Sequence, residues 1–317
     1  MNGSEIPVRL DVTTLAIAPS SSSAPSQVFQ TLFIQLTQPQ TLIQPNLLPH
    51  LILPPDLDLT REIIIFGQAP VWLYGRLIHQ CAIAPWIGCF DARNYQIIVI
   101  HSRVATPQVG DTFAVQRQRQ PCPAILIGGP PDSGKSVFSN ALRRSLIQHY
   151  PHYRIFLHRA NWDGEGNWAY ESRNMELVDD LVEQNEYRIH EDPETAKLIP
   201  DYYRYHGRVV QNLRNLVDIL LVDVGGKPQA EKEPLIQECS HYIIVTRSPE
   251  FLPSWHEFCQ PHLAAIAIIH SVLQQRMDCV SDAPILELVA GPWTEADVTD
   301  VPTILINRIE SISLTIG

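Results

Sequence analysis

The feature that most constrains this 317-residue chain is a glycine-rich loop at residues 129–136, with the pattern Gly-x-x-x-x-Gly-Lys-Ser. The apolar run 124–127 precedes it, and apolar residues at helical spacing follow it. This order of strand, loop and helix is typical of a P-loop, in which backbone N–H groups hold phosphates, the lysine reaches the terminal phosphates and the serine binds Mg²⁺. The sequence therefore predicts a site for ATP and Mg²⁺. Its predicted nucleotide-binding residues are Gly129, Gly134, Lys135 and Ser136.

A second pattern belongs to the same predicted site. The apolar run 219–222 ends at Asp223, as expected of a strand whose last carboxylate holds Mg²⁺ directly or through water. Residues 223–226 also read Asp-x-x-Gly, in which the N–H of Gly226 would contact a γ-phosphate. We expect residues 124–317 to form a P-loop NTPase domain with a mainly parallel sheet covered by helices. Further short apolar runs that indicate strands lie at 153–157, 242–245 and 285–289.

The charge of the chain is unevenly distributed. The formal net charge is −11, yet residues 1–119 carry seven basic and seven acidic side chains, so the whole acidic excess lies beyond them. Without a broad basic surface, binding to long nucleic acid is not expected. No run reaches the roughly 20 apolar residues of a membrane span, so we expect a cytoplasmic protein that does not enter a membrane. Residues 116–123 lack apolar periodicity and predict a linker between domains 1–115 and 124–317.

Residues 1–115 predict a small α+β domain. Helical spacing after Pro70 indicates a helix whose last turn holds His79, and Asp91 and His101 would end two successive strands. We expect these three side chains to converge at one rim of the sheet. A carboxylate and two imidazoles can hold a divalent metal or transfer protons, and Arg93 beside them would suit a phosphate. On spacing alone, a solvated rim with ordinary hydrogen-bonded histidines is the simpler explanation of the same residues.

Several patches of this first segment resemble one family. Residues 67–79, 87–93, 97–102 and 110–111 are similar to the manganese-dependent, CRISPR-associated ring nucleases of type III systems, and the resemblance extends over about residues 5–113. That family degrades cyclic oligoadenylate messengers, chiefly cyclic tetraadenylate, and so switches off the immune response. It is also known as a fusion to a P-loop module often labelled AAA, whose phosphate loop residues 128–136 resemble.

The resemblance also implies a site and an assembly. Mn²⁺ would be held by Asp91 with His79. In the family the ring lies between two dimers, so we expect a homo-oligomer, a dimer, tetramer or larger assembly, whose facing subunits share the site. The nucleophile would be a ribose 2′-hydroxyl or a water molecule. The catalytic positions of the family fall on His79, Asp91, Arg93 and His101.

These observations predict a ring nuclease that cleaves cyclic tetraadenylate to linear di-adenylate and switches off type III CRISPR defence, with an ATP-binding domain that regulates or extends the activity. Two alternatives stay open. In the first, the N-terminal domain is a cyclic-nucleotide sensor that does not cleave, coupled to a P-loop ATPase. In the second, the chain is a nucleoside or nucleotide kinase with an N-terminal assembly domain, because Asp163 and Glu165 lie where such kinases place a substrate-facing acid.

Overall fold

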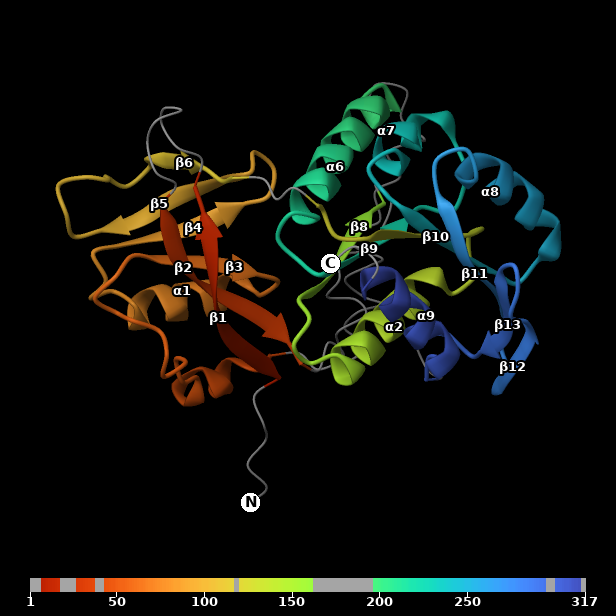
Figure 1. Ribbon diagram of the computed structural model, residues 1–317, viewed down its shortest axis with the longest axis horizontal. Coiled ribbons are helices and arrows are strands. Elements are labelled where there is room, and N and C mark those ends of the chain that lie inside the picture. Colours follow the sequence, from red (N-terminus) through yellow and green to blue (C-terminus); the bar gives the residue numbers. More distant parts are fainter. Residues whose placement is uncertain are drawn as a thin grey trace, which may run out of the picture. The chain divides into compact units, whose positions relative to one another are not determined.

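The computed structural model describes residues 7–17, 27–37, 43–116, 120–161, 196–294 and 300–314. The chain divides into two compact units, Met1–Arg119 and Gln120–Gly317 (Figure 1). Each unit is built on a β-sheet of its own. Within the described ranges, none of the helices has both the length and the apolar character needed to cross a membrane.

The N-terminal unit contains a six-stranded sheet with its strands in sequence order from β1 to β6. Neighbours β2, β3 and β4 are parallel, and the other neighbouring pairs are antiparallel. Helix α1 (Val71–Gln80) connects β3 to β4 and begins directly after Pro70, where a missing N–H costs no hydrogen bond. A 3-10 helix, η1 (Pro45–His50), lies between β2 and β3 in the chain. The strands are β1 (Val8–Ala16), β2 (Val28–Leu36), β3 (Ile63–Gly67), β4 (Trp86–Asp91), β5 (Gln96–Ser102) and β6 (Thr112–Ala114).

The sheet of the N-terminal unit has two cores, one packed against helix α1 and one formed by aromatic rings. Leu73 and Leu77 of α1 pack into an aliphatic core with residues of β2, β3 and β4. The outer strands meet beyond their ends, where Ile17 and Val115 form an antiparallel bridge and the N–H of Gln116 donates to the carbonyl of Ala16 at 2.8 Å. The sheet is therefore partly closed on itself. Its other core is aromatic, with ring contacts among Phe29, Phe33, Phe66, Trp86, Phe90, Tyr95 and Phe113.

The C-terminal unit contains a seven-stranded sheet in the order β12-β13-β11-β10-β7-β9-β8. All neighbouring strands are parallel except β12 and β13. Helices α2 (Lys135–His149) and α9 (Thr303–Leu314) cover one face, and α6 (Ile199–Leu213), α7 (Glu233–Ile236) and α8 (Leu252–Cys259) cover the other (Figure 1). The predicted fold class, a small α+β domain followed by a mainly parallel α/β domain, is confirmed. The strands are β7 (Ala124–Gly128), β8 (Ile155–Ala160), β9 (Ile219–Val224), β10 (His241–Thr246), β11 (Ala264–Ser271), β12 (Arg276–Ser281) and β13 (Leu286–Gly291).

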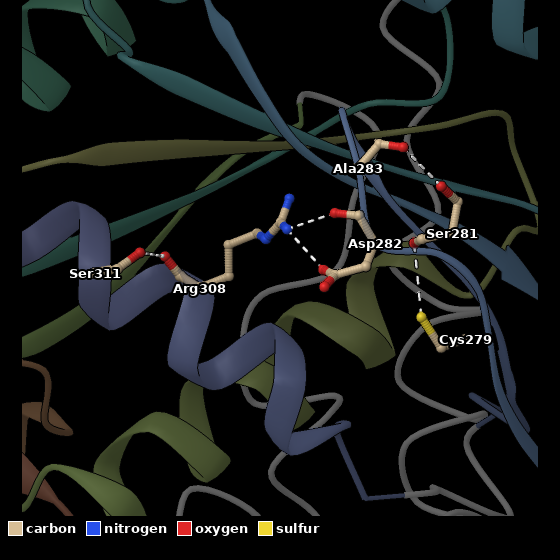
Figure 2. Close-up of polar contacts among 6 residues, drawn as sticks. All are labelled: Cys279, Ser281, Asp282, Ala283, Arg308 and Ser311. Atoms are coloured by element: carbon tan, nitrogen blue, oxygen red, sulfur yellow. Dashed lines mark hydrogen bonds and ion pairs between the residues drawn. The ribbon is translucent and has the colours of Figure 1, made fainter.

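Helix α9 is hydrogen-bonded to the turn between the antiparallel strands β12 and β13. Nη2 of Arg308 donates to the backbone carbonyl of Asp282 at 2.6 Å and to its Oδ1 at 2.7 Å, as Figure 2 shows. Asp282 follows β12 directly, so one side chain joins the last helix to the β12–β13 turn. Ser281 closes the same turn by donating its hydroxyl to the carbonyl of Ala283 at 2.9 Å (Figure 2).

Candidate functional site

The loop between β7 and α2 has the backbone of a tight phosphate-binding turn. Gly129 and Gly134 have φ angles of 152° and 80°, which side chains rarely allow. A Cβ at Gly129 would lie 1.9 Å from the carbonyl oxygen of Val245, and one at Gly134 would lie 2.5 Å from that of Trp293. Both predicted glycines are thus required by this loop. The loop ends where α2 begins, at Lys135, so the first N–H groups of the helix have no partner within the helix and face its N-terminus.

Lys135 is folded over the loop that precedes it. Its Nζ donates to the carbonyl oxygen of Pro130 at 3.4 Å. Burial lowers the pKa of Lys135, and the nearby carboxylates of Asp223 and Asp132 oppose that shift. An ammonium that has lost part of its hydration gains most from an anionic ligand, because water competes less for its charge. The position of this lysine therefore fits a phosphate group held by the loop.

Asp223 supplies a buried carboxylate at the end of β9. It pairs in register with Ile127, the residue before the last one of β7, so the two motifs meet on adjacent strands. The residue is 2% exposed, and neither carboxylate oxygen accepts a hydrogen bond. Nε of Arg159, 3.4 Å from Oδ2, makes an ion pair with it. A buried carboxylate without hydrogen-bond donors is costly, and a divalent cation would offset that cost.

The chemistry of these residues fits Mg²⁺ and a nucleotide. Mg²⁺ in nucleotide sites takes one or two protein oxygens and completes its shell with water and phosphate oxygens. Asp223 would hold the ion with the hydroxyl of Ser136, in the first turn of α2. The bound ion would neutralise phosphate charge, while the loop and Lys135 would orient the phosphates.

The loop after β9 packs against the P-loop. A Cβ at Gly226 would lie 2.8 Å from the backbone nitrogen of Pro131, and one at Gly225 would lie 2.8 Å from Oδ1 of Asn161. Close approach of the Pro131 backbone therefore explains the glycine at 226, and the side chain of Asn161 packs against Gly225. The structure brings the Asp-x-x-Gly segment and the Gly-x-x-x-x-Gly-Lys-Ser segment together, as the sequence predicts.

Lys232 is a residue of this region that the sequence does not reveal. It is 2% exposed, and its Nζ donates to the carbonyl oxygen of Gly225 at 2.7 Å and to that of Lys227. Burial, followed by repulsion from Lys135, lowers its pKa to about 7. The surrounding residues 227–233 are mostly polar or charged, a pattern typical of an exposed loop, so no sequence signal marks this lysine as buried.

In the N-terminal unit, Asp91 and Arg93 belong to the turn between β4 and β5. Oδ1 of Asp91 accepts a hydrogen bond from the backbone N–H of Arg93 at 3.0 Å, and Oδ2 accepts one from Nδ2 of Asn94 at 2.9 Å. Both oxygens therefore stabilise the turn. The side chain of Arg93 is exposed beside them.

His79 and His101 lie at the other end of the β4–β5 hairpin. His101 pairs in register with Ile87 near the start of β4, whereas Asp91 pairs with Gln96 at its end. Ile87 and Asp91 are four residues apart, about 13 Å along a strand. Helix α1 returns to the start of β4, and the carbonyl of its residue His79 accepts the N–H of Ala82 at 3.3 Å. Nε2 of His101 contacts the carbonyl of that same Ala82 at 3.2 Å.

The expected convergence of Asp91 and His101 at one rim is therefore wrong. Because β4 and β5 are antiparallel, the ends of these successive strands lie at opposite rims. The described residues contain no group of three or more His, Cys, Asp or Glu side chains placed to hold a metal ion. Asp91 and His79 of a single subunit accordingly do not fit the Mn²⁺ site that the resemblance implies.

The N-terminal segment that carries these four residues matches a known family. Residues 36–114 match the CRISPR-associated protein (Cas_csx3) family. The match covers less than half of the chain and runs from the end of β2 to the end of β6. A stretch of 51 residues is 39% identical to an uncharacterized protein of Aquifex aeolicus (strain VF5). It covers 16% of this chain and 46% of that relative, so the two share less than half of the relative's length.

Two solved structures are similar to the chain at low identity. One is the septum site-determining protein MinD complexed with Mg-ADP from Pyrococcus horikoshii OT3, with a TM-score of 0.35, 16% identity, and coverage of 47% of this chain and 70% of that one. The other is a putative plasmid partition protein from Borrelia burgdorferi B31 bound to AMPPNP, with a TM-score of 0.41, 12% identity, and coverage of 62% and 99%. The predicted acids Asp163 and Glu165 lie outside the described residues.

Proposed function

We propose that this protein is a CRISPR-associated ring nuclease that cleaves cyclic tetraadenylate, with a C-terminal unit that binds ATP and Mg²⁺ and regulates or extends the cleavage. The nucleotide-binding half rests on one observation, the buried carboxylate of Asp223 that accepts no hydrogen bond beside the P-loop. The ring-cleaving half is supported by the family match over residues 36–114 and by the residue types at the two ends of the β4–β5 hairpin.

Two copies of the chain would share each cleavage site. His79 and His101 would come from one copy, and Asp91 and Arg93 would come from the facing copy, because one subunit holds the two pairs at opposite rims. The exposed guanidinium of Arg93 would neutralise a phosphate oxygen of the ring. One of the two imidazoles would take the proton of the nucleophile or give a proton to the leaving oxygen, because an imidazole can act as a general base or a general acid.

The substrate class follows from the charges of the N-terminal unit. The four charged side chains between residues 70 and 110 are three arginines and one aspartate, a local excess of positive charge in a chain of net charge −11. A compact phosphate ring needs only such a local patch, whereas long nucleic acid needs an extended basic surface. The nucleophile is a 2′-hydroxyl of the ring itself or a water molecule, and the products distinguish the two routes, because a 2′-hydroxyl leaves a 2′,3′-cyclic phosphate.

The experiment that tests this proposal is incubation of the full chain with cyclic tetraadenylate, followed by chromatography of the products. We expect linear di-adenylate, and the reaction is repeated with Mn²⁺, with a chelator and with ATP to test the metal and the coupling. A ring that is bound and returned intact would contradict cleavage and favour the sensor. Transfer of labelled phosphate from ATP to a nucleoside or nucleotide would favour the kinase.

A further inference from the structure

The side-chain nitrogen of Lys232 is held inside the C-terminal unit by backbone oxygens and aromatic rings. Its Nζ lies 5.9 Å from the centroid of the Tyr203 ring and 5.8 Å from that of Trp255, and both rings are 1% exposed or less. Removing an ammonium from water is costly unless hydrogen bonds and charges offset it. Two carbonyls and two ring faces offset part of that cost here. The lysine is thus fixed in one position.

The carbonyls that Lys232 binds belong to the loop that contacts the P-loop. They are those of Gly225 and Lys227, on either side of Gly226 in the chain. Gly226 itself approaches Pro131 so closely that a Cβ there would lie 2.8 Å from the proline nitrogen. Lys232 and the P-loop therefore both contact this short loop.

A second contact joins the surroundings of Lys232 to the start of the P-loop. The Trp255 ring that faces the ammonium also packs on the backbone of Gly128, where a Cβ would lie 2.6 Å from Cζ3 of the ring. The lysine, the tryptophan and the last residue of β7 thus form one packed group. A displacement of Lys232 would therefore shift both residues 224–227 and the end of β7, the strand that precedes the P-loop.

We propose that Lys232 is a positioning residue that fixes residues 224–227 so that the site distinguishes a nucleoside triphosphate from a diphosphate. This inference rests on the nucleotide binding proposed above. The P-loop amides and Lys135 would hold the phosphates that ATP and ADP share. Only the terminal phosphate of ATP would accept a hydrogen bond from the N–H of Gly226. The position of that N–H depends on Lys232, which binds the carbonyls of the residues on either side of it.

The test compares Lys232→Met with the wild-type chain by calorimetry, using ADP and the non-hydrolysable AMPPNP, each with Mg²⁺. Loss of one well-placed hydrogen bond to a charged phosphate weakens binding by about tenfold or more. We therefore expect AMPPNP affinity to fall about tenfold and ADP affinity to stay nearly constant. Lys197→Met is the matched control, because that side chain is exposed and lies outside residues 224–227, and it should change neither affinity.

The outcomes separate this inference from the nucleotide binding on which it rests. Equal affinity changes for both nucleotides in Lys232→Met, or no change in either, would overturn the positioning role while leaving nucleotide binding intact. A wild-type chain that binds neither nucleotide would overturn both. Lys232→Arg keeps the charge and the donors, and partial recovery of the AMPPNP preference in it would support the assignment.

A second measurement needs no variant, and it decides the matter if Lys232→Met fails to fold. Hydrogen exchange of residues 224–232 is followed in the wild-type chain with ADP and with AMPPNP. If Lys232 holds this loop against the terminal phosphate, AMPPNP will slow exchange there more than ADP does. Equal protection by the two nucleotides would overturn the proposal.

Discussion

Asp91 and His101 lie at opposite ends of the β4–β5 hairpin, although they end successive strands in the sequence. Asp91 pairs with Gln96 beside the turn, and His101 pairs with Ile87 near the start of β4. His79 lies at the His101 end and Arg93 at the Asp91 end. A site that needs all four side chains therefore needs two copies of the chain.

Mixing two inactive variants should restore ring cleavage. Asp91→Asn keeps the histidine end of a subunit, and His101→Ala keeps the aspartate end. If subunits pair at random, about a quarter of the shared sites will combine one intact end from each variant. We expect each variant alone to be nearly inactive and the equimolar mixture to recover activity, measured as cyclic tetraadenylate consumed with time.

The matched control for that experiment is a mixture of Asp91→Asn with Arg93→Ala. Both changes lie at the same end of the hairpin, so no pairing of these subunits creates an intact site. Recovery in this control mixture, or its absence in the first mixture, would contradict a site shared between copies.

Replacing Lys135 with methionine should remove most of the nucleotide affinity. The ammonium lies over the loop, with Asp223 and Asp132 near enough to affect its pKa. Charge-assisted hydrogen bonds contribute about 1.5–3 kcal/mol each, so the affinity for ATP with Mg²⁺ should fall at least about tenfold. Calorimetry on the full chain measures this affinity. Unchanged affinity in Lys135→Met would contradict the role of the P-loop in nucleotide binding.

Two glycine substitutions should change stability in opposite directions. Gly75 lies within α1, and a Cβ added there would meet no atom within 4 Å, so Gly75→Ala should raise the free energy of unfolding by about 0.5–1 kcal/mol. Gly129 has a φ of 152° and no room beside Val245, so Gly129→Ala should lower it by at least about 1 kcal/mol. Denaturant unfolding of both variants checks these signs, and a stabilised Gly129→Ala would contradict the loop geometry.

Acid should destabilise the C-terminal unit through a pair of histidines. Nε2 of His158 lies 2.8 Å from Nδ1 of His206, and burial lowers their pKa values to about 3 and about 4. The unfolded chain takes up these protons near pH 6.5, where the folded chain does not, so stability falls as the pH drops below 6.5. Each histidine contributes at most about 1.4 kcal/mol for each pH unit.

The variant that tests this effect is His206→Gln, which keeps a polar partner for His158 but removes one titrating group. We expect the unfolding free energy of His206→Gln to depend less on pH between 6.5 and 4.5 than that of the wild type. His152→Gln serves as control, because His152 is exposed. An identical pH dependence in wild type and His206→Gln would argue against the pair.

The sequence predicts the P-loop well because its signal is local. The apolar strand, the glycines and the following helix are contiguous, and the carboxylate of Asp223 comes at the end of a strand that must lie in the same sheet. The short strand β6 and the antiparallel strand β12 carry weaker signals, because β6 has three residues and every described residue of β12 but the last is exposed. Their partners are close in the chain, since β6 pairs with β5 and β12 pairs with β13, so the weak signal lies in the strands themselves.

The direction of β5 could have been predicted, and the position of Lys232 could not. Only residues 92–95 separate β4 from β5, and parallel strands need a crossover of a dozen residues or more, so this short connection already indicates an antiparallel hairpin. The burial of Lys232 depends on Tyr203 and Trp255, which belong to helices α6 and α8 on either side of it in the chain. No local sequence pattern predicts a contact between residues so far apart in the chain.

The bridge between Ile17 and Val115 limits how copies of the N-terminal unit can associate. Where these residues meet, the first and last strands already satisfy each other's backbone groups, so that stretch of edge cannot add a strand from another molecule. Assembly by continuous sheet extension is thereby disfavoured at this point. The shared site proposed above would instead need copies stacked rim against rim, with the histidines of one molecule over the aspartate turn of the next.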